Sequence, residues 1–463
     1  MADSFLKSER KDIRNVLSRF KKRNFTGDTG QAIKNSSYQV AQNILMKIGS
    51  LIFTIIVARI LLPNLFGLYS LALSTIVLFS SFSDVGVGAA MMTFIPKMLA
   101  RKNPGKAKGY LKKLAKWKVF LIVLCSFVLL ALSYFIAKDY YEKPIFYALL
   151  TGAAYIPLVG LEGFFENLFK LNNDFRTPTK KELIFQIARL ILVPIAALLV
   201  VSIGTTPDQS TGIVIFSLNL SYLVGVSYMA IVSRKKVAFL NVKSKNLNVK
   251  ETEGLKRFLA PLVTMSLSGV FFGYIDTIML GHYVSSEYIS YYSAAFNLIG
   301  SAAAVIGFAA TALFPIFSRA NGKRLEKIFK KSLSFTFLIS LVTGLIAYAF
   351  ATEIVDLSYG SEYLTAVPIL QWFSILIIIL PLLGFYSTYL ISRKRTGIIA
   401  WLLIGTTILN IILNFFFITY GLRFSQLDAV LGACFATIIS RFIYFGGLAV
   451  ARRKYIKSKK EKL

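Results

Sequence analysis

Apolar runs of membrane-spanning length constrain this chain more than any other feature. The first, Ile44 to Leu62, ends at a break at Pro63-Asn64, and the second covers about 68–94. A run of about 20 apolar residues matches the hydrocarbon thickness of a bilayer. Ten more runs follow, at about 118–137, 145–169, 183–203, 211–232, 258–281, 289–316, 332–351, 364–391, 397–419 and 428–450. The sequence therefore predicts an all-α polytopic membrane protein with twelve transmembrane helices.

Composition agrees with this fold class and excludes several kinds of site. Hydrophobic residues make up 56% of the chain and charged residues only 16%, against roughly 25% in ordinary domains. Cys125 and Cys434 both lie in apolar runs, and His282 is the only histidine. These counts predict neither a disulfide framework nor a metal centre. The polar, basic first residues do not resemble a cleavable signal peptide, so we expect the first apolar run to direct insertion.

The net charge of +31 is explained by where the cations lie. Of the 53 Lys and Arg residues, 46 fall at the two ends of the chain and in alternate loops. Such a bias places the cation-rich side in the cytoplasm. We therefore expect a protein of the cytoplasmic (plasma) membrane with both termini inside, and no nucleic-acid partner. A basic amphipathic helix near Ile13–Phe20 is expected to contact anionic lipids, although a disordered basic tail is an equal alternative.

The chain divides into two halves of six spans. The predicted segments are a basic N-terminal segment (1–43), a first half (44–232), a cytoplasmic linker (233–256), a second half (257–451) and a basic cytoplasmic tail (452–463). Phe66–Ala72 aligns with Ile289–Ala295, and each motif opens the second span of its half. Repeats of this kind are typical of transporters that bind substrate between two halves and alternate its access.

Several motifs carry a resemblance to a known family. They are Val57–Leu61, Phe66–Tyr69, Phe82–Gly86, Tyr274–Gly281 and Tyr291–Ala295. With them the chain resembles the polysaccharide-transport (Wzx-type) flippases of the multidrug/oligosaccharidyl-lipid/polysaccharide (MOP) exporter superfamily. The resemblance implies a V-shaped bundle whose first, second, seventh and eighth spans face a cavity. It also implies a transporter rather than an enzyme, which flips lipid-linked oligosaccharide to the outer leaflet for cell-surface glycan synthesis. Polymerase or glycosyltransferase machinery would be its protein partners.

Two cations in the first span are candidate ligands of a diphosphate. Arginine grips phosphate oxygens in a bidentate way, so Arg59 is a candidate contact, with snorkelling to the outer head groups as the alternative. Lys47 belongs to a polar stripe at helical spacing, which favours a place in a cavity. The stripe consists of Gln39, Asn43, Lys47, Ser50 and Thr54. Lys47 and Asn43 are therefore also candidate substrate ligands.

Charged residues of the fourth and fifth spans have two interpretations. Glu162 and Glu166 lie four residues apart, at a depth similar to that of Arg189. A structural Glu166–Arg189 ion pair is the simpler interpretation, because buried charges usually pair. In the other, Arg189 binds substrate and Glu166 belongs to a coupling or gating site. Glu162 would remain without a partner, as a coupling carboxylate for H⁺ or Na⁺.

The remaining polar candidates are spread over four spans. Asp276 and Asp84 are placed toward the outer ends of the seventh and second spans, as coupling or gating residues. Asp276 is expected to pair with Arg59 when the outer gate is closed, and helix-end solvation is the alternative for Asp84. Asn410 and Asn414 would bind sugar hydroxyls or join helices. No cofactor is expected apart from a coupling cation.

Three other functions compete with this interpretation. A cation-coupled multidrug antiporter should present acids in its first span, where this chain has Lys47 and Arg59. A flippase for lipid II or a teichoic-type precursor stays open, since both carry the same diphosphate. A membrane-embedded enzyme would need a clustered acid/base or metal site, which the short outer loops do not offer.

Overall fold

The computed structural model describes residues 27–84, 86–313, 317 and 322–460, and every regular element in those ranges is helical. The elements are α2 (Gly27–Phe82), α3 (Val87–Ala100), α4 (Pro104–Tyr134), η1 (Phe135–Tyr140), α5 (Phe146–Leu171), α6 (Arg176–Ile203), α7 (Pro207–Lys236), η2 (Ala238–Asn241), α8 (Val249–Tyr283), α9 (Ser286–Ala312), α11 (Gly322–Ala349), α12 (Ala351–Tyr359), η3 (Ser361–Ala366), α13 (Val367–Ser392), α14 (Thr396–Gly421) and α15 (Gln426–Lys460).

The predicted all-α membrane fold is confirmed. Ten stretches of the described chain are long and apolar enough to span a bilayer, and one of them, 34–100, holds the first two predicted spans. The predicted run 258–281 lies in α8, where the side chains of 260–272 are outside the description. The amphipathic helix expected near Ile13–Phe20 is also outside the described residues.

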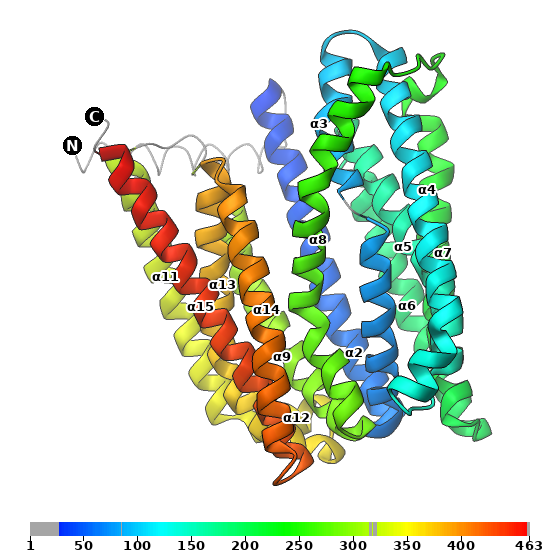
Figure 1. The fold of residues 1–463 in the computed structure, drawn as a ribbon, viewed down its shortest axis with the longest axis vertical. Helices are drawn as coiled ribbons and strands as arrows, with labels where there is room; N and C mark the ends of the chain where they lie inside the picture. Colours follow the sequence, from blue (N-terminus) through cyan, green and yellow to red (C-terminus); the bar gives the residue numbers. More distant parts are fainter. Residues whose placement is uncertain (1–26, 85, 314–316, 318–321, 461–463) are drawn as a thin grey trace.

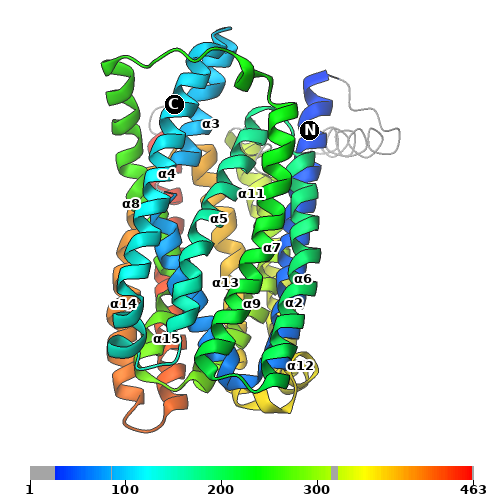
Figure 2. The same ribbon diagram turned by 90° about the vertical axis from the view of Figure 1, so that its right-hand side faces the viewer.

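The helices form two bundles arranged as a V (Figure 1). One holds α2–α7, the other holds α9–α15, and α8 runs between them. We call the end with Gly27 and Lys460 the terminal end, and the opposite end the distal end. The bundles converge at the distal end and diverge toward the terminal end. In the first bundle α7 packs against both α5 and α6, as Figure 2 also shows.

The first two spans form the hairpin that the sequence predicts. Helix α2 runs to the distal end, turns at Leu62 and returns. Leu62, the residue before Pro63, has φ 58° and ψ 172°, outside the helical region, and helices usually end at or before the residue preceding a proline. The returning span breaks again after Phe82, and α3 starts after Gly86, whose φ of 73° suits glycine.

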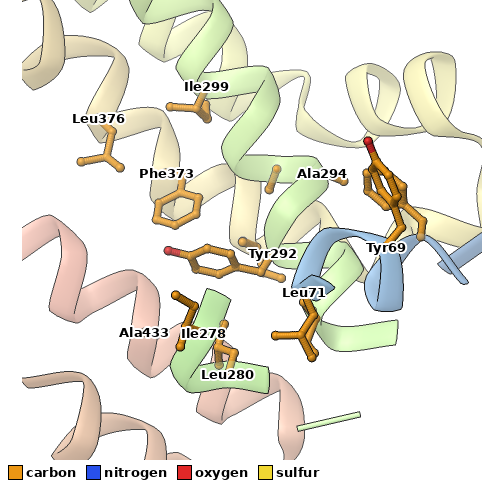
Figure 3. Packing of buried hydrophobic residues seen from close by; sticks show 14 of the residues in the cluster. Tyr69, Leu71, Ile278, Leu280, Tyr292, Ala294, Ile299, Phe373, Leu376 and Ala433 are labelled. Atoms are coloured by element: carbon orange, nitrogen blue, oxygen red, sulfur yellow. The ribbon is translucent and has the colours of Figure 1, made fainter. Parts of the chain in front are cut away.

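A hydrophobic core joins the two halves at the distal end. Figure 3 shows Leu71 of α2 beside Leu280 of α8, while the ring of Tyr292 lies between Phe373 and Ile278. The Tyr292 and Phe373 ring centroids are 5.3 Å apart. A Cβ atom at Gly281 would lie 2.3 Å from Leu71 Cδ1, so the helices meet where glycine allows it.

The linker between the halves is attached to the first bundle at the terminal end. It passes across the ends of α3 and α4 on its way to α8 (Figure 2). The Lys245 amide donates to the Gly105 carbonyl oxygen at 2.9 Å, and Lys106 pairs with Glu251 at 2.7 Å. Phe258 of α8 packs edge-on against Phe94 of α3. Helix α8 begins at Val249, within the predicted linker, and its first turns pack with the first bundle up to Phe258, just past the predicted boundary at 257.

Candidate transport cavity

A cavity of about 420 Å³ lies between the two halves. Six helices contribute to its wall: α2, α5, α6 and α7 from one side, α8 and α9 from the other. The hairpin turn at Leu62 makes this possible, since α2 presents both its descending and its returning segment. Its polar lining residues are Lys47, Ser50, Thr54, Tyr69, Ser70, Ser74, Tyr155, Arg189, Tyr222, Tyr274, Thr277, Tyr292, Ser293, Asn297 and Ser301.

Two cations line the cavity, and no carboxylate does so among the described residues. Arg189 of α6 has a side chain held over two aromatic rings, with its guanidinium carbon 4.2 Å from the Phe53 ring centroid and 5.2 Å from that of Phe185. Its Nη2 donates to Gln186 Oε1 at 2.6 Å, while its buried Nε meets no acceptor in the described chain. Lys47 is half-buried on α2. The cavity is thus a positively charged site.

The polar stripe predicted on the first span enters the cavity for part of its length. Lys47, Ser50 and Thr54 line the wall, whereas Asn43 and Gln39 are not among the lining residues. Contact of Lys47 or Asn43 with substrate stays a prediction.

The expected Glu166–Arg189 ion pair is wrong, because Lys181 and Lys170 take Glu166 instead. Lys181 Nζ lies 3.7 Å from Glu166 Oε1, and Lys170 Nζ lies 3.2 Å from Glu166 Oε2. Lys181 belongs to a loop in the sequence interpretation, but α6 begins at Arg176 and carries Lys181 into the bundle. Arg189 lies eight residues further along α6, which is about 12 Å along a helix. Of these two cations of α6, Lys181 is therefore the one at the depth of the carboxylates.

Lys181 also takes the carboxylate that was expected to remain without a partner. Its ammonium contacts Glu162, and it lies 3.1 Å from Glu182 Oε2. Gln186 then links Glu182 to Arg189, donating to Glu182 Oε1 at 2.6 Å. A buried charge network therefore lies behind the cavity wall and ends at Arg189. The sequence signal that was missed is the Lys181-Glu182 pair at the start of the fifth span.

A second polar cluster is buried in the second half, around Asp276. Its carboxylate accepts hydrogen bonds from Tyr292 at 2.6 Å, and from Asn414 and Thr437. Arg441 interacts with it electrostatically. The Asp276–Arg59 pair expected at a closed gate is not formed, because these donors satisfy Asp276 within its own half.

The two asparagines of α14 join helices. Asn414 donates to Asp276 of α8, and Asn410 donates to Thr437 of α15 at 3.4 Å. Both are buried and neither lines the cavity. Of the two interpretations, the contacts support helix joining, and a sugar contact stays a prediction.

Arg59 lies at the distal end, outside the cavity lining. Its Nε donates to the Ser358 carbonyl oxygen at 2.7 Å, and its Nη2 to those of Leu357 and Asp356. These carbonyls end α12, where a cation is favoured by the helix dipole. Arg59 therefore connects the two halves.

Further contacts close the distal end. Tyr363 donates to the Ala58 carbonyl at 3.0 Å, Asn64 to Glu287 at 3.1 Å, and Lys143 to the Gly281 carbonyl at 2.6 Å. His282 Nδ1 lies 2.7 Å from the Tyr140 carbonyl oxygen. We call this set of contacts, together with Arg59, the distal gate.

Asp84 lies at the break between α2 and α3, which corrects its predicted depth. The second span starts at the distal end, so a residue late in that span is nearer the terminal end. Its carboxylate pairs with Lys118 at 2.8 Å, and the Lys118 side chain is only 2% exposed. The ion pair thus bridges the broken span and α4, although the Asp84 side chain is itself more than half exposed.

These features define a class of protein: a multi-pass membrane transporter or flippase with a cavity between two helical halves. The chain belongs to the polysaccharide biosynthesis protein family, whose model matches residues 32–321, and thus to the MOP exporter superfamily. A second model, MatE, matches residues 261–416. No curated protein sequence matches the chain.

Solved structures share the fold at low sequence identity. The lipid II flippase MurJ in an inward closed conformation has a TM-score of 0.67 at 14% identity, covering 90% of this chain and 87% of its own. An inward-facing multidrug resistance MATE family transporter has a TM-score of 0.60 at 14% identity, covering 92% and 96%. The Vibrio cholerae MATE transporter VcmN in the bent form has a TM-score of 0.56 at 16% identity, covering 91% and 98%. At these identities the likeness concerns the fold.

Proposed function

We propose that this protein flips polyprenyl-diphosphate-linked oligosaccharide from the cytoplasmic to the outer leaflet by alternating access, as a transporter without a catalytic step. The observation that carries the proposal is the charge of the cavity: Lys47 and Arg189 line it, and the described lining has no carboxylate. A diphosphate needs cationic, hydrogen-bonding groups to leave water. The lipid chain can stay in the bilayer while the head group crosses between the halves.

We infer the orientation in the membrane, and with it the direction of flipping, from the loops that carry the cations. Cation-rich loops and both ends of the described chain lie at the terminal end, which the positive-inside rule assigns to the cytoplasm. The halves diverge on that side and the distal gate is closed, so this conformation admits cargo from inside. The plasma membrane is the location we propose, with polymerase or glycosyltransferase machinery to receive the cargo.

A MATE-like cation antiporter is the second candidate, because the MatE model matches part of the chain and a MATE transporter shares its fold. A site for organic cations needs acids facing the cargo, whereas Glu162 and Glu166 are held by Lys181 and Lys170 behind the wall. Lipid II and teichoic-type precursors carry the same diphosphate, and the MurJ likeness is consistent with such a cargo.

Asp276 is the coupling carboxylate that we favour, for H⁺ or Na⁺. It is buried, and its donors come from α9, α14 and α15, so a change in its charge would act on several helices. Asp84 at the α2–α3 break is the gating candidate nearer the terminal end. If transport by Asp276→Asn keeps the ion dependence of the wild type, Asp276 is not the coupling residue.

The test is a flipping assay in reconstituted vesicles, with a fluorescent diphosphate-linked oligosaccharide whose outer-leaflet fraction is read by an impermeant quencher. We expect Arg189→Gln to slow flipping about 10- to 100-fold, since a hydrogen bond to a charged group contributes about 1.5–3 kcal/mol. Arg101→Gln, at an exposed arginine of the α3–α4 turn, is the matched control. Wild-type flipping at the empty-vesicle rate, or export of organic cations instead, would refute the proposal.

A further inference from the structure

The two walls of the cavity differ in charge. Both lining cations, Lys47 and Arg189, belong to the first half. The lining that α8 and α9 provide has hydroxyl, amide and aromatic side chains and no charged group among its described residues. An asymmetric cargo, with an anionic and a neutral part, would match the two walls separately.

The α9 wall has a polar stripe. Ser293, Asn297 and Ser301 follow each other at four-residue spacing, so they share one helix face. Asn297 Nδ2 donates to the Ser293 carbonyl oxygen at 2.8 Å, which uses one N–H of the amide and fixes its position. The neighbouring Phe296 ring stacks on Tyr292 and packs against Phe373. The stripe is therefore held on a rigid face.

Open space lies beside this stripe. A Cβ atom at Gly300 of α9 would meet nothing within 4 Å, and the same holds at Gly273 of α8. Two glycines of the first half, Gly49 and Gly152, are tightly packed instead: a Cβ at Gly49 would lie 2.4 Å from Gln186, and one at Gly152 would lie 2.3 Å from Ile76. The lining glycines of the second half thus make room in the cavity rather than allow close helix contact.

Two residues of the opposite wall have buried polar atoms without a hydrogen-bond partner in the described chain. Tyr69 and Arg189 both line the cavity, and both residues are buried. The Tyr69 hydroxyl and Arg189 Nε are buried atoms with no hydrogen-bond partner within the described chain. Buried polar atoms without partners are unfavourable by about 1–3 kcal/mol. A ligand with hydrogen-bonding oxygens would satisfy both.

We propose that Ser293, Asn297 and Ser301 form a recognition site for the neutral sugar next to the diphosphate. The open space beside Gly300 determines how large a sugar this site accepts. The inference rests on the proposed function and deepens it: Lys47 and Arg189 hold the diphosphate, and α9 reads the glycan. Cargo that spans both walls contacts both halves at once. It therefore binds best when they approach each other, and its binding favours closure of the terminal end.

The test compares two probes on purified protein in lipid nanodiscs: a prenyl diphosphate carrying an oligosaccharide and the same prenyl diphosphate without sugar. We expect Gly300→Leu to weaken the glycan-bearing probe at least about tenfold by filling its space, while the sugar-free probe binds as to wild type. Asn297→Ala should weaken the same probe without adding bulk. Gly405→Leu, on an exposed face of α14 with nothing within 4 Å of its Cβ, controls for the added side chain.

Each alternative outcome has a distinct meaning. If Gly300→Leu and Asn297→Ala weaken both probes equally, or neither, then α9 does not read sugar and the inference is overturned while the proposed function stands. If wild type binds neither probe, the proposed function fails and the inference with it. If only the glycan-bearing probe loses affinity, while Arg189→Gln weakens both, the inference holds.

Discussion

The two halves of this protein have related backbones and different chemistry. Tyr69 and Ser70 on the returning segment of α2 align with Tyr292 and Ser293 on α9, and all four line the cavity. Behind the first wall, Lys181 contacts three glutamates, and the network reaches Arg189 through Gln186. Behind the second wall, Asp276 is satisfied mostly by neutral donors. The repeat therefore supplies the geometry of both walls, and a few charged substitutions decide what each wall can bind.

The largest expected effect is a loss of stability when the first half loses a buried cation. Lys181→Met leaves Glu162 and Glu182 buried without their shared cation, and breaking a buried ion pair costs about 3–5 kcal/mol. We expect thermal unfolding in detergent at a much lower temperature. The neighbouring Lys180→Met, at an exposed position, should unfold like wild type. Equal melting of both variants would show that the network does not stabilise this half.

A smaller loss is expected in the second half. Asp276→Asn keeps the shape of the side chain, and the hydroxyls of Tyr292 and Thr437 can reorient to accept from the new amide. We expect a destabilisation of about 1–3 kcal/mol, the range for a buried hydrogen-bonding group that loses its match. Chemical denaturation against Asp139→Asn, an exposed acid, measures it. A loss larger than that of Lys181→Met would reverse the ranking of the two halves.

The distal gate, where the halves meet, should respond more weakly. Arg59→Gln removes a cation from the carbonyls that end α12, an interaction worth about 0.3–1 kcal/mol at an exposed site. We expect the distal-open population to rise by up to about fivefold. Labelling of Thr277→Cys in the cavity by an impermeant maleimide from the distal side reports it, with little background because Cys125 and Cys434 are buried. Arg59→Lys should label at a rate close to wild type, and an unchanged rate in Arg59→Gln would exclude this role.

The smallest effect concerns the linker that attaches the start of α8 to the first half. The hydrogen bond from Lys106 lowers the pKa of the half-buried Glu251 below its usual value. A carboxyl with a depressed folded-state pKa stabilises above its unfolded pKa, about 4.3, and that contribution disappears as pH falls through the folded-state pKa. The hydrogen-exchange protection factors of the 238–251 amides, which correct for the intrinsic pH dependence of exchange, should therefore fall below about pH 4. In Glu251→Gln that fall should be absent. Wild-type protection factors that stay constant with pH would contradict this.

Much of the fold could be predicted because its cause is local. Apolar runs of bilayer length, the break at Pro63 and the cation bias of the loops each depend on residues near one another in sequence. Less of the candidate site could be predicted from the sequence. The sequence predicts a loop at Lys181 because apolar periodicity begins only after it, whereas α6 starts at Arg176, about a turn and a half before Lys181. The α9 stripe could not be predicted from the sequence, because serine, asparagine and glycine are common in apolar helices. Their role in a cavity becomes visible only when the opposite wall is known.

The sequence alone determined that this chain crosses a membrane many times, which end carries the cations, and that it has two related halves. Hydrocarbon admits only backbone that satisfies its own hydrogen bonds, so length and hydropathy leave few choices. Only the tertiary structure decided which charges meet. Lys181 meets Glu162 across the neighbouring helices α5 and α6, and Asp276 finds Asn414 and Thr437 on helices distant in the chain. Arg189 lines the cavity, while Lys181 is the cation beside the glutamates. Pairing of buried charges depends on depth and helix rotation to within one turn, and these follow from the packing of all the helices together.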